Sequence, residues 1–125
     1  MDENDIAYMV IGAAIEVHKN LGPGLLESAY QNCLMRELDL SGIDYETEAP
    51  IALSYKGEII ENACRADFFV EGKVLVELKT VDRLNDKHKA QLLTYLRLAN
   101  RKLGLLINFN EILIKNGIKR VVNQL

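Results

Sequence analysis

The chain has 125 residues, of which 49% are hydrophobic and 26% charged, and its formal net charge is −3. This length suffices for one domain that buries a core without disulfide staples, and the composition is ordinary for a globular protein. No apolar run approaches the roughly 18 residues of a membrane span and the N-terminus is acidic, so we expect a cytoplasmic protein without signal peptide or membrane contact.

The cysteine pattern argues against a metal centre built on thiolates. Cys33 and Cys64 are far apart in the sequence and form no CxxC or Cys/His motif. We therefore expect two reduced, buried thiols rather than a zinc site.

The charged residues are unevenly distributed along the chain. Residues 1–78 contain five Lys or Arg against 15 Asp or Glu, whereas residues 79–125 contain ten against three. Such polarity fits a site where carboxylates hold cations and a neighbouring basic surface meets phosphates. The alternative is that the two sets of charges mix once the chain is folded.

Two amphipathic helices are predicted at the start of the chain. Apolar residues recur at steps of three and four from Ile6 to Leu21, and acidic or amide residues just before them can cap the first turn. The sequence Gly22-Pro23-Gly24 ends this helix, and a second helix is predicted from about residue 25 to Ser41.

From Ile43 the hydrophobic period changes to two, which predicts three antiparallel strands. The first strand, up to Tyr55, contains the polar residues Glu46 and Glu48, which indicates an edge strand or an extended lead-in. A turn at Lys56-Gly57-Glu58 leads to a long strand over residues 59–70, and a third strand covers residues 74–80.

The last two of these strands carry the chemistry. Side chains alternate along a strand, so the even positions form one wholly apolar face: Ala66, Phe68, Val70, Val74, Val76 and Leu78. The odd positions place Arg65, Asp67, Glu77 and Lys79 on the other face. The alternative is a half-buried hairpin whose outer face is merely solvated and charged.

The loop of this hairpin decides whether the two acids share a face. A two-residue loop would place Asp67 and Glu77 on opposite faces, so an odd loop or a bulge is required. We expect a three-residue loop, Val70-Glu71-Gly72, with the glycine in the left-handed region. Asp67 then opposes Leu75 and lies diagonal to Glu77, at roughly 7–8 Å between backbone positions.

A third helix and a final pair of strands complete the predicted order. The helix covers residues 86–100, with Lys87, Gln91 and Tyr95 on one face and an apolar stripe on another: Ala90, Leu92, Leu93, Leu96 and Ala99. Residues 103–109 are expected to form a buried strand parallel to a neighbour, and residues 112–114 and 118–122 a last hairpin around Asn116-Gly117.

Three motifs in these elements resemble one superfamily. Asp67 on one strand and Glu77-Leu78-Lys79 on the next resemble the PD-(D/E)XK nuclease motif, although Ala66 stands where that motif has proline. The segment Gly24-Leu25-Leu26-Glu27-Ser28-Ala29-Tyr30 is similar to the pattern that names the GxxExxY proteins, a branch of that superfamily. Gln91-Leu92-Leu93-Thr94-Tyr95 resembles the QxxxY motif of RecB-like members.

The resemblance implies a fold, an activity and a set of site residues. The expected fold is α/β, a single restriction-endonuclease-like domain over residues 1–125 with an αβββαβ core and a mixed sheet flanked by helices. The expected activity is Mg²⁺- or Mn²⁺-dependent hydrolysis of phosphodiester bonds, with DNA as the substrate and little sequence specificity. Its catalytic residues are Asp67, Glu77, Lys79, Gln91 and Glu27; the metal ligands are Asp67, Glu77, Glu27 and the Leu78 carbonyl; the nucleic-acid contacts are Tyr95, Lys87, Arg83 and Tyr30.

Other interpretations of the same residues stay open. A nuclease-fold module without activity, acting as a nucleic-acid-binding or regulatory subunit, agrees with the incomplete first half of the motif. An unrelated α/β interaction domain requires all the motifs to arise by chance in the right order. The patterns do not distinguish a monomer from a homodimer or from an assembly with a protein partner.

Overall fold

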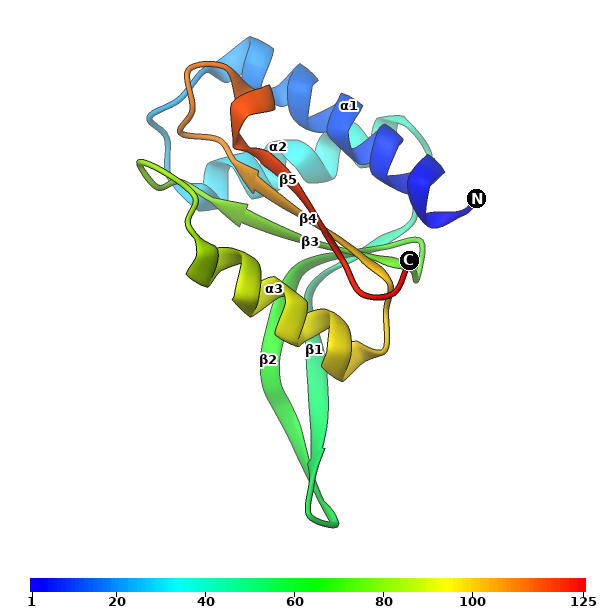
Figure 1. The fold of residues 1–125 in the computed structure, drawn as a ribbon. Coiled ribbons are helices and arrows are strands. Elements are labelled where there is room, and N and C mark those ends of the chain that lie inside the picture. Colours follow the sequence, from blue (N-terminus) through cyan, green and yellow to red (C-terminus); the bar gives the residue numbers. More distant parts are fainter.

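A five-stranded mixed sheet runs through the computed structural model, which describes all 125 residues (Figure 1). The strands lie side by side in chain order: β1 (Tyr45–Tyr55), β2 (Glu58–Val70), β3 (Val74–Lys79), β4 (Leu103–Asn108) and β5 (Ile118–Val122). Helices α1 (Glu3–Leu21) and α2 (Glu27–Leu40) cover one face, and α3 (Asp86–Ala99) covers the other. This arrangement confirms the predicted α/β fold with an αβββαβ core.

The N-terminal helices begin and end where the sequence predicts. Asp2 caps α1 by accepting a hydrogen bond from Asp5 N–H, while the Asp5 carboxylate accepts one from Asp2 N–H. Gly22, with φ 70°, ends α1. Neither these helices nor α3 is long and apolar enough to cross a membrane.

The core divides into two layers, one on each side of the sheet. The larger packs α1 and α2 against the hairpin and contains five of the six predicted even positions: Phe68, Val70, Val74, Val76 and Leu78. Ala66 is also buried but belongs to the smaller layer, so the expectation that it shares this apolar face is wrong. The smaller lies beneath α3 and includes Leu75, Leu92, Leu96 and Leu106. On β3, Leu75 faces α3 and Lys79 bonds to Gln91 of α3, so the odd positions Glu77 and Lys79 lie on the α3 side of the sheet.

The hairpin between β2 and β3 has an odd loop, as predicted, but the loop lies one residue later. Val70 pairs with Val74, so the loop is Glu71-Gly72-Lys73, with Gly72 at φ 65°. The expectation that Asp67 opposes Leu75 is therefore wrong, because Phe69 takes that place. The observed register instead places Asp67 directly opposite Glu77.

The hairpin between β1 and β2 is long and irregular. A two-residue turn at Lys56-Gly57 closes it, and its distal half projects beyond the rest of the sheet (Figure 1). The register shifts between the pair Leu53–Ile60 and the pair Ile51–Cys64, because β2 has two more residues there than β1.

The C-terminal part of the chain places α3 between two parallel strands. β3 and β4 pair in parallel from Val74–Leu103 to Lys79–Asn108, which confirms the predicted crossover. Ala90 is exposed rather than part of the inner stripe of α3. Residues 112–114 do not form the predicted strand; a short 3-10 helix (Ile114–Gly117) precedes β5, which pairs antiparallel with β4.

Candidate active site

Asp67 and Glu77 lie opposite each other where the β2–β3 ladder opens, one position past the pair Phe68–Val76. Asp67 N–H donates to Glu77 Oε1 at 3.0 Å, and Leu78 N–H donates to Asp67 Oδ2 at 2.7 Å. Each carboxylate is thus anchored through one oxygen to the backbone of the opposite strand.

The second oxygen of each carboxylate remains accessible. Asp67 Oδ1 and Glu77 Oε2 take part in none of the hydrogen bonds that anchor the pair. Because no buried side-chain polar atom in the structure lacks a partner, these two oxygens are not sealed inside the protein. Each carboxyl group of the pair therefore has one oxygen anchored by a hydrogen bond and one that is free of it.

The protein environment makes it unfavourable for both carboxyl groups of this pair to be ionised. Burial, followed by repulsion from Asp67, raises the pKa of Glu77 to about 8, and Lys79 offsets this only in part. Burial also raises the pKa of Asp67, while the hydrogen bond from Leu78 N–H opposes the rise. Two carboxylates this close ionise together only when positive charge compensates them.

Glu27 contributes a third carboxylate from another element. It is the first residue of α2, where the partial positive charge of a helix N-terminus favours an acid. Partial burial raises its pKa, Asp67 raises it further, and Lys79 lowers it. The side chain therefore lies within electrostatic reach of the hairpin acids, although it is itself exposed.

A fourth carboxylate, Glu48, was not among the predicted site residues. Glu48 lies on β1 in a gap of the ladder opposite Asp67, with φ 50°, and its charge raises the pKa of Asp67. Gln31 of α2 donates to Glu48 Oε1 at 3.1 Å and to the Asp67 carbonyl at 3.4 Å. This amide links the N-terminal helix pair to the centre of the acidic cluster.

Lys79 and Gln91 approach the pair from β3 and α3. Lys79 Nζ donates to Gln91 Oε1 at 3.3 Å, so the amine is held on the α3 side of the sheet. It is the cation whose charge acts on Asp67, Glu77 and Glu27 alike.

The segment between Lys79 and α3 is fixed by a buried amide. Asn108, fully buried at the end of β4, accepts from Val81 N–H at 3.1 Å and donates to the Val81 carbonyl at 2.8 Å. Phe109 N–H donates to the Lys79 carbonyl at 3.0 Å. These bonds hold the chain where it leaves β3 and turns toward α3.

Tyr95 follows Gln91 by one helical turn and also faces the site. Burial raises the pKa of its hydroxyl, and the charges of Glu77, Cys64 and Asp67 add to this effect. Burial likewise raises the pKa of the Cys64 thiol, with Glu77 contributing. Both cysteines are free and only partly buried, so the expected reduced state agrees with the structure, whereas full burial does not.

Tyr30 does not reach the site surface, which corrects the expectation that it contacts nucleic acid. The residue is fully buried and its ring stacks on Phe109 with centroids 4.6 Å apart. Its hydroxyl donates to the Gly22 carbonyl at 2.6 Å and accepts from Leu25 N–H at 3.1 Å. Tyr30 therefore fixes the loop that sets the position of Glu27.

The remaining predicted residues lie around the pair rather than in it. Lys87 and Arg83 are exposed, and neither is among the charges that act on the pKa of Asp67 or Glu77. The Leu78 side chain is buried in the larger core layer, and its N–H anchors Asp67.

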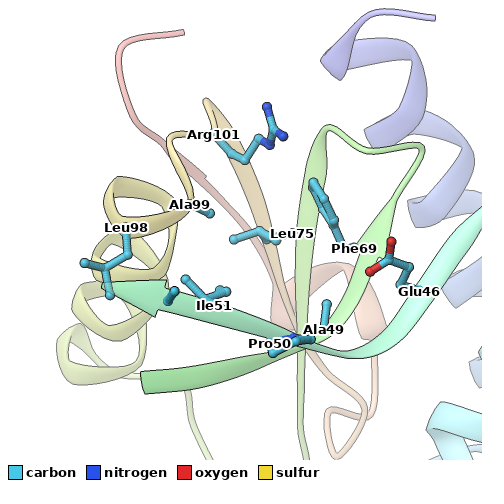
Figure 2. Close-up of a pocket in the computed structure, with 10 residues that line it drawn as sticks. Glu46, Ala49, Pro50, Ile51, Phe69, Leu75, Leu98, Ala99 and Arg101 are labelled. Atoms are coloured by element: carbon cyan, nitrogen blue, oxygen red, sulfur yellow. The ribbon is translucent and has the colours of Figure 1, made fainter. Parts of the chain in front are cut away.

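A pocket of about 370 Å³ lies between the sheet and the end of α3 (Figure 2). Phe69 and Leu75, each two residues from one of the acids, line it together with the end of α3. Arg101 lies over the Phe69 ring, 5.3 Å from its centroid. The pocket is mainly apolar and contains none of the predicted catalytic side chains.

The residues of the pair fit a hard divalent cation in the chemistry of their donors. Carboxylate oxygens are the ligands that Mg²⁺ and Mn²⁺ prefer, and a dication supplies the positive charge that the pair lacks. As the side chains stand, no three His, Cys, Asp or Glu residues converge closely enough to hold a metal ion.

Two opposed acids and a lysine at the end of a mixed sheet define a nuclease-like class of α/β protein. Residues 4–121 match the PD-(D/E)XK nuclease superfamily, and the chain belongs to that superfamily. Its members are typically metal-dependent and act on nucleic acid. None of the curated protein sequences is significantly similar to the chain.

The fold is also similar to a solved structure titled "Crystal structure of SSO0001". The TM-score is 0.57 at 22% sequence identity, over 79% of this chain and 51% of that one. The chain thus spans about half the length of that protein. At this level of identity the similarity concerns the fold alone.

Proposed function

We propose that the chain is a nuclease of the GxxExxY branch that hydrolyses phosphodiester bonds of nucleic acid, with DNA as its substrate, in the presence of Mg²⁺ or Mn²⁺. The observation that carries the proposal is the anchored pair Asp67–Glu77. Each carboxylate is held through one oxygen and presents the other, on a face that Lys79 and Gln91 also reach. Superfamily membership supports the same class of reaction.

Four groups are candidates to hold the cation. Asp67 and Glu77 supply one accessible oxygen each, and Glu27 and the Leu78 carbonyl complete the set. A bound divalent cation supplies Lewis acidity, which polarises the phosphate and acidifies water. The buried, mutually repelling carboxylates bind it because its charge relieves their repulsion.

Lys79 and Gln91 act on the substrate. Lys79 neutralises charge that develops on the phosphate, which is effective because its amine is held in place before the reaction. Gln91, hydrogen bonded to that amine, orients Lys79 and the substrate. Tyr95 lines the site, and the exposed Lys87 and Arg83 contact the nucleic-acid backbone nearby. None of these groups reads base edges, so sequence specificity is low.

Cleavage assays test this function. Purified protein is incubated with supercoiled, linear and single-stranded DNA in Mg²⁺, Mn²⁺ or a chelator. We expect cleavage with the metals and none with the chelator. Glu77→Gln abolishes cleavage, Lys79→Met lowers single-turnover cleavage by about 10²-fold or more, and Glu61→Gln, an exposed acid elsewhere on β2, leaves it unchanged.

Two outcomes contradict the proposal. If the parent binds DNA but cleaves none of the three forms with either metal, the chain is a nuclease-fold binding module. If cleavage occurs but survives Glu77→Gln, the reaction takes place elsewhere.

A further inference from the structure

A basic groove of about 430 Å³ surrounds the free edge of β5. It is lined by four cations and three isoleucines, and by no acidic residue: Lys89, Lys115, Lys119, Arg120, Ile11, Ile15 and Ile118. Figure 1 shows β5 at the margin of the sheet between α1 and α3, and both helices contribute lining residues. We call this feature the β5-edge groove.

The alternation of β5 places cations on both sides of the sheet edge. Ile118 packs against the larger core and Arg120 donates to Asn4 Oδ1 of α1 at 2.7 Å, so these side chains face α1. Val121 belongs to the smaller core, so Lys119 faces α3, where Lys89 lies. The groove therefore follows an open strand edge with positive charge on either flank.

The acidic pair alone is a poor surface for a polyanion. Glu27 and Glu48 surround Asp67 and Glu77, and Lys79 is the cation that acts on them. A divalent cation compensates this charge only locally. Affinity for a nucleic-acid backbone must therefore come from cations outside the pair.

The β5-edge groove is close enough to supply that affinity. Lys79 pairs with Asn108 at the end of β4, and the neighbouring Ile107 pairs with Ile118 at the start of β5. β3 and β5 are thus two strand spacings apart, about 10 Å, at the same end of the sheet. On α3, Gln91 reaches Lys79, whereas Lys89, two residues earlier, lines the groove.

We propose that the β5-edge groove binds the phosphodiester backbone of a nucleic-acid strand and anchors it beside the acidic pair. The proposal deepens the nuclease function and rests on it for the identity of the polyanion. The four cations contact phosphates, and the isoleucines provide an apolar floor without hydrogen-bonding groups that read base edges. The anchoring is therefore independent of sequence and sensitive to salt.

A pair of charge-matched double variants tests the groove. Lys115→Glu with Lys119→Glu reverses two groove cations, whereas Arg36→Glu with Lys56→Glu reverses two cations on α2 and at the β1–β2 turn. Arg120 is left unchanged because its bond to Asn4 ties β5 to α1. Binding of a labelled 20-nucleotide DNA is measured in chelator over a series of salt concentrations, with thermal melts as a check of folding.

We expect the groove variant to bind the DNA about tenfold or more weakly than the parent. The slope of log affinity against log salt concentration should decrease by the equivalent of about two phosphate contacts. The control variant is expected to bind like the parent. Because the measurement is made in chelator, it does not depend on cleavage and stays decisive if the chain proves inactive. Equal losses of DNA affinity in both variants would show that only the net charge of the protein matters, which would overturn the proposal. Parent-like affinity of the groove variant would also overturn it.

Discussion

At the scale of single residues, Glu77 shows how the fold prepares a site. The carboxyl is buried, faces Asp67 and has a pKa raised to about 8 from its ordinary value of 4.5. The folded protein without a cation therefore binds a proton that the unfolded chain releases between these two pH values. In that window the free energy of unfolding falls as pH rises, by at most about 1.4 kcal/mol per pH unit.

This linkage predicts the effect of Glu77→Gln on stability. The amide stays uncharged, and its oxygen can still accept a hydrogen bond from Asp67 N–H. The free energy of unfolding of the variant should therefore fall much less between pH 5 and pH 8 than that of the parent. Urea unfolding in chelator at several pH values measures it. The variant should be more stable than the parent at pH 8, and the difference should shrink toward pH 5. Parallel curves for the two proteins would contradict the assigned pKa.

The sequence predicted most of the side chains that the structure brings together at the candidate site, but not all of them. Alternation along the strands placed Asp67, Glu77 and Lys79 on one face, and helical spacing placed Gln91 with Tyr95. Glu48 was not predicted because the sequence does not show which residue of β1 lies opposite Asp67; counted from the observed turn at Lys56-Gly57 without a register shift, that residue would be Glu46. The register shift that brings Glu48 opposite Asp67 depends on a bulge that no local sequence pattern predicts.

At the scale of elements, the contact of α3 with β4 determines where Gln91 lies. A Cβ on Gly104 of β4 would meet three atoms of Leu92 of α3 at 2.9–3.0 Å. Only glycine permits this close approach. Gln91 is next to Leu92 on the same helix, so the packing of Leu92 in the smaller core determines how closely the Gln91 side chain approaches Lys79.

Gly104→Ala is therefore expected to destabilise the fold. Leu92 Cγ is among the contacted atoms, so a simple change of rotamer at its end does not relieve the clash, and overpacking of this kind costs about 1–3 kcal/mol. Urea unfolding measures the loss. Gly12→Ala on α1 serves as the control, because its added Cβ meets nothing within 4 Å and should stabilise the helix slightly. Equal stability of the two variants would show that α3 is free to move.

Element types were predictable, whereas their exact pairing was not. The hairpin loop was predicted as odd from the need to place two acids on one face, yet its position shifted by one residue. Glu71 and Gly72 both adopt positive φ, which allows Val70 to pair with Val74. Residues 112–114 are only three consecutive apolar residues, too few to define a strand, and the chain turns there through a 3-10 helix instead.

At the scale of the whole molecule, acidic and basic side chains gather on different surfaces. The acidic N-terminal part contributes Glu27, Glu48, Asp67 and Glu77 to one cluster, and the basic C-terminal part lines the β5-edge groove. The uneven charge along the sequence predicted such a separation. Its location depended on the order of strands, because β5 reaches the margin of the sheet only by pairing with β4.

Metal binding by the pair Asp67–Glu77 is the central claim, and calorimetric titration with Mn²⁺ tests it most directly. The titration is made at about pH 8, where Glu77 releases its proton readily. The parent should bind with a measurable affinity that Asp67→Asn and Glu77→Gln each weaken greatly, whereas Glu61→Gln should bind like the parent. Unchanged Mn²⁺ binding in both Asp67→Asn and Glu77→Gln would contradict the account.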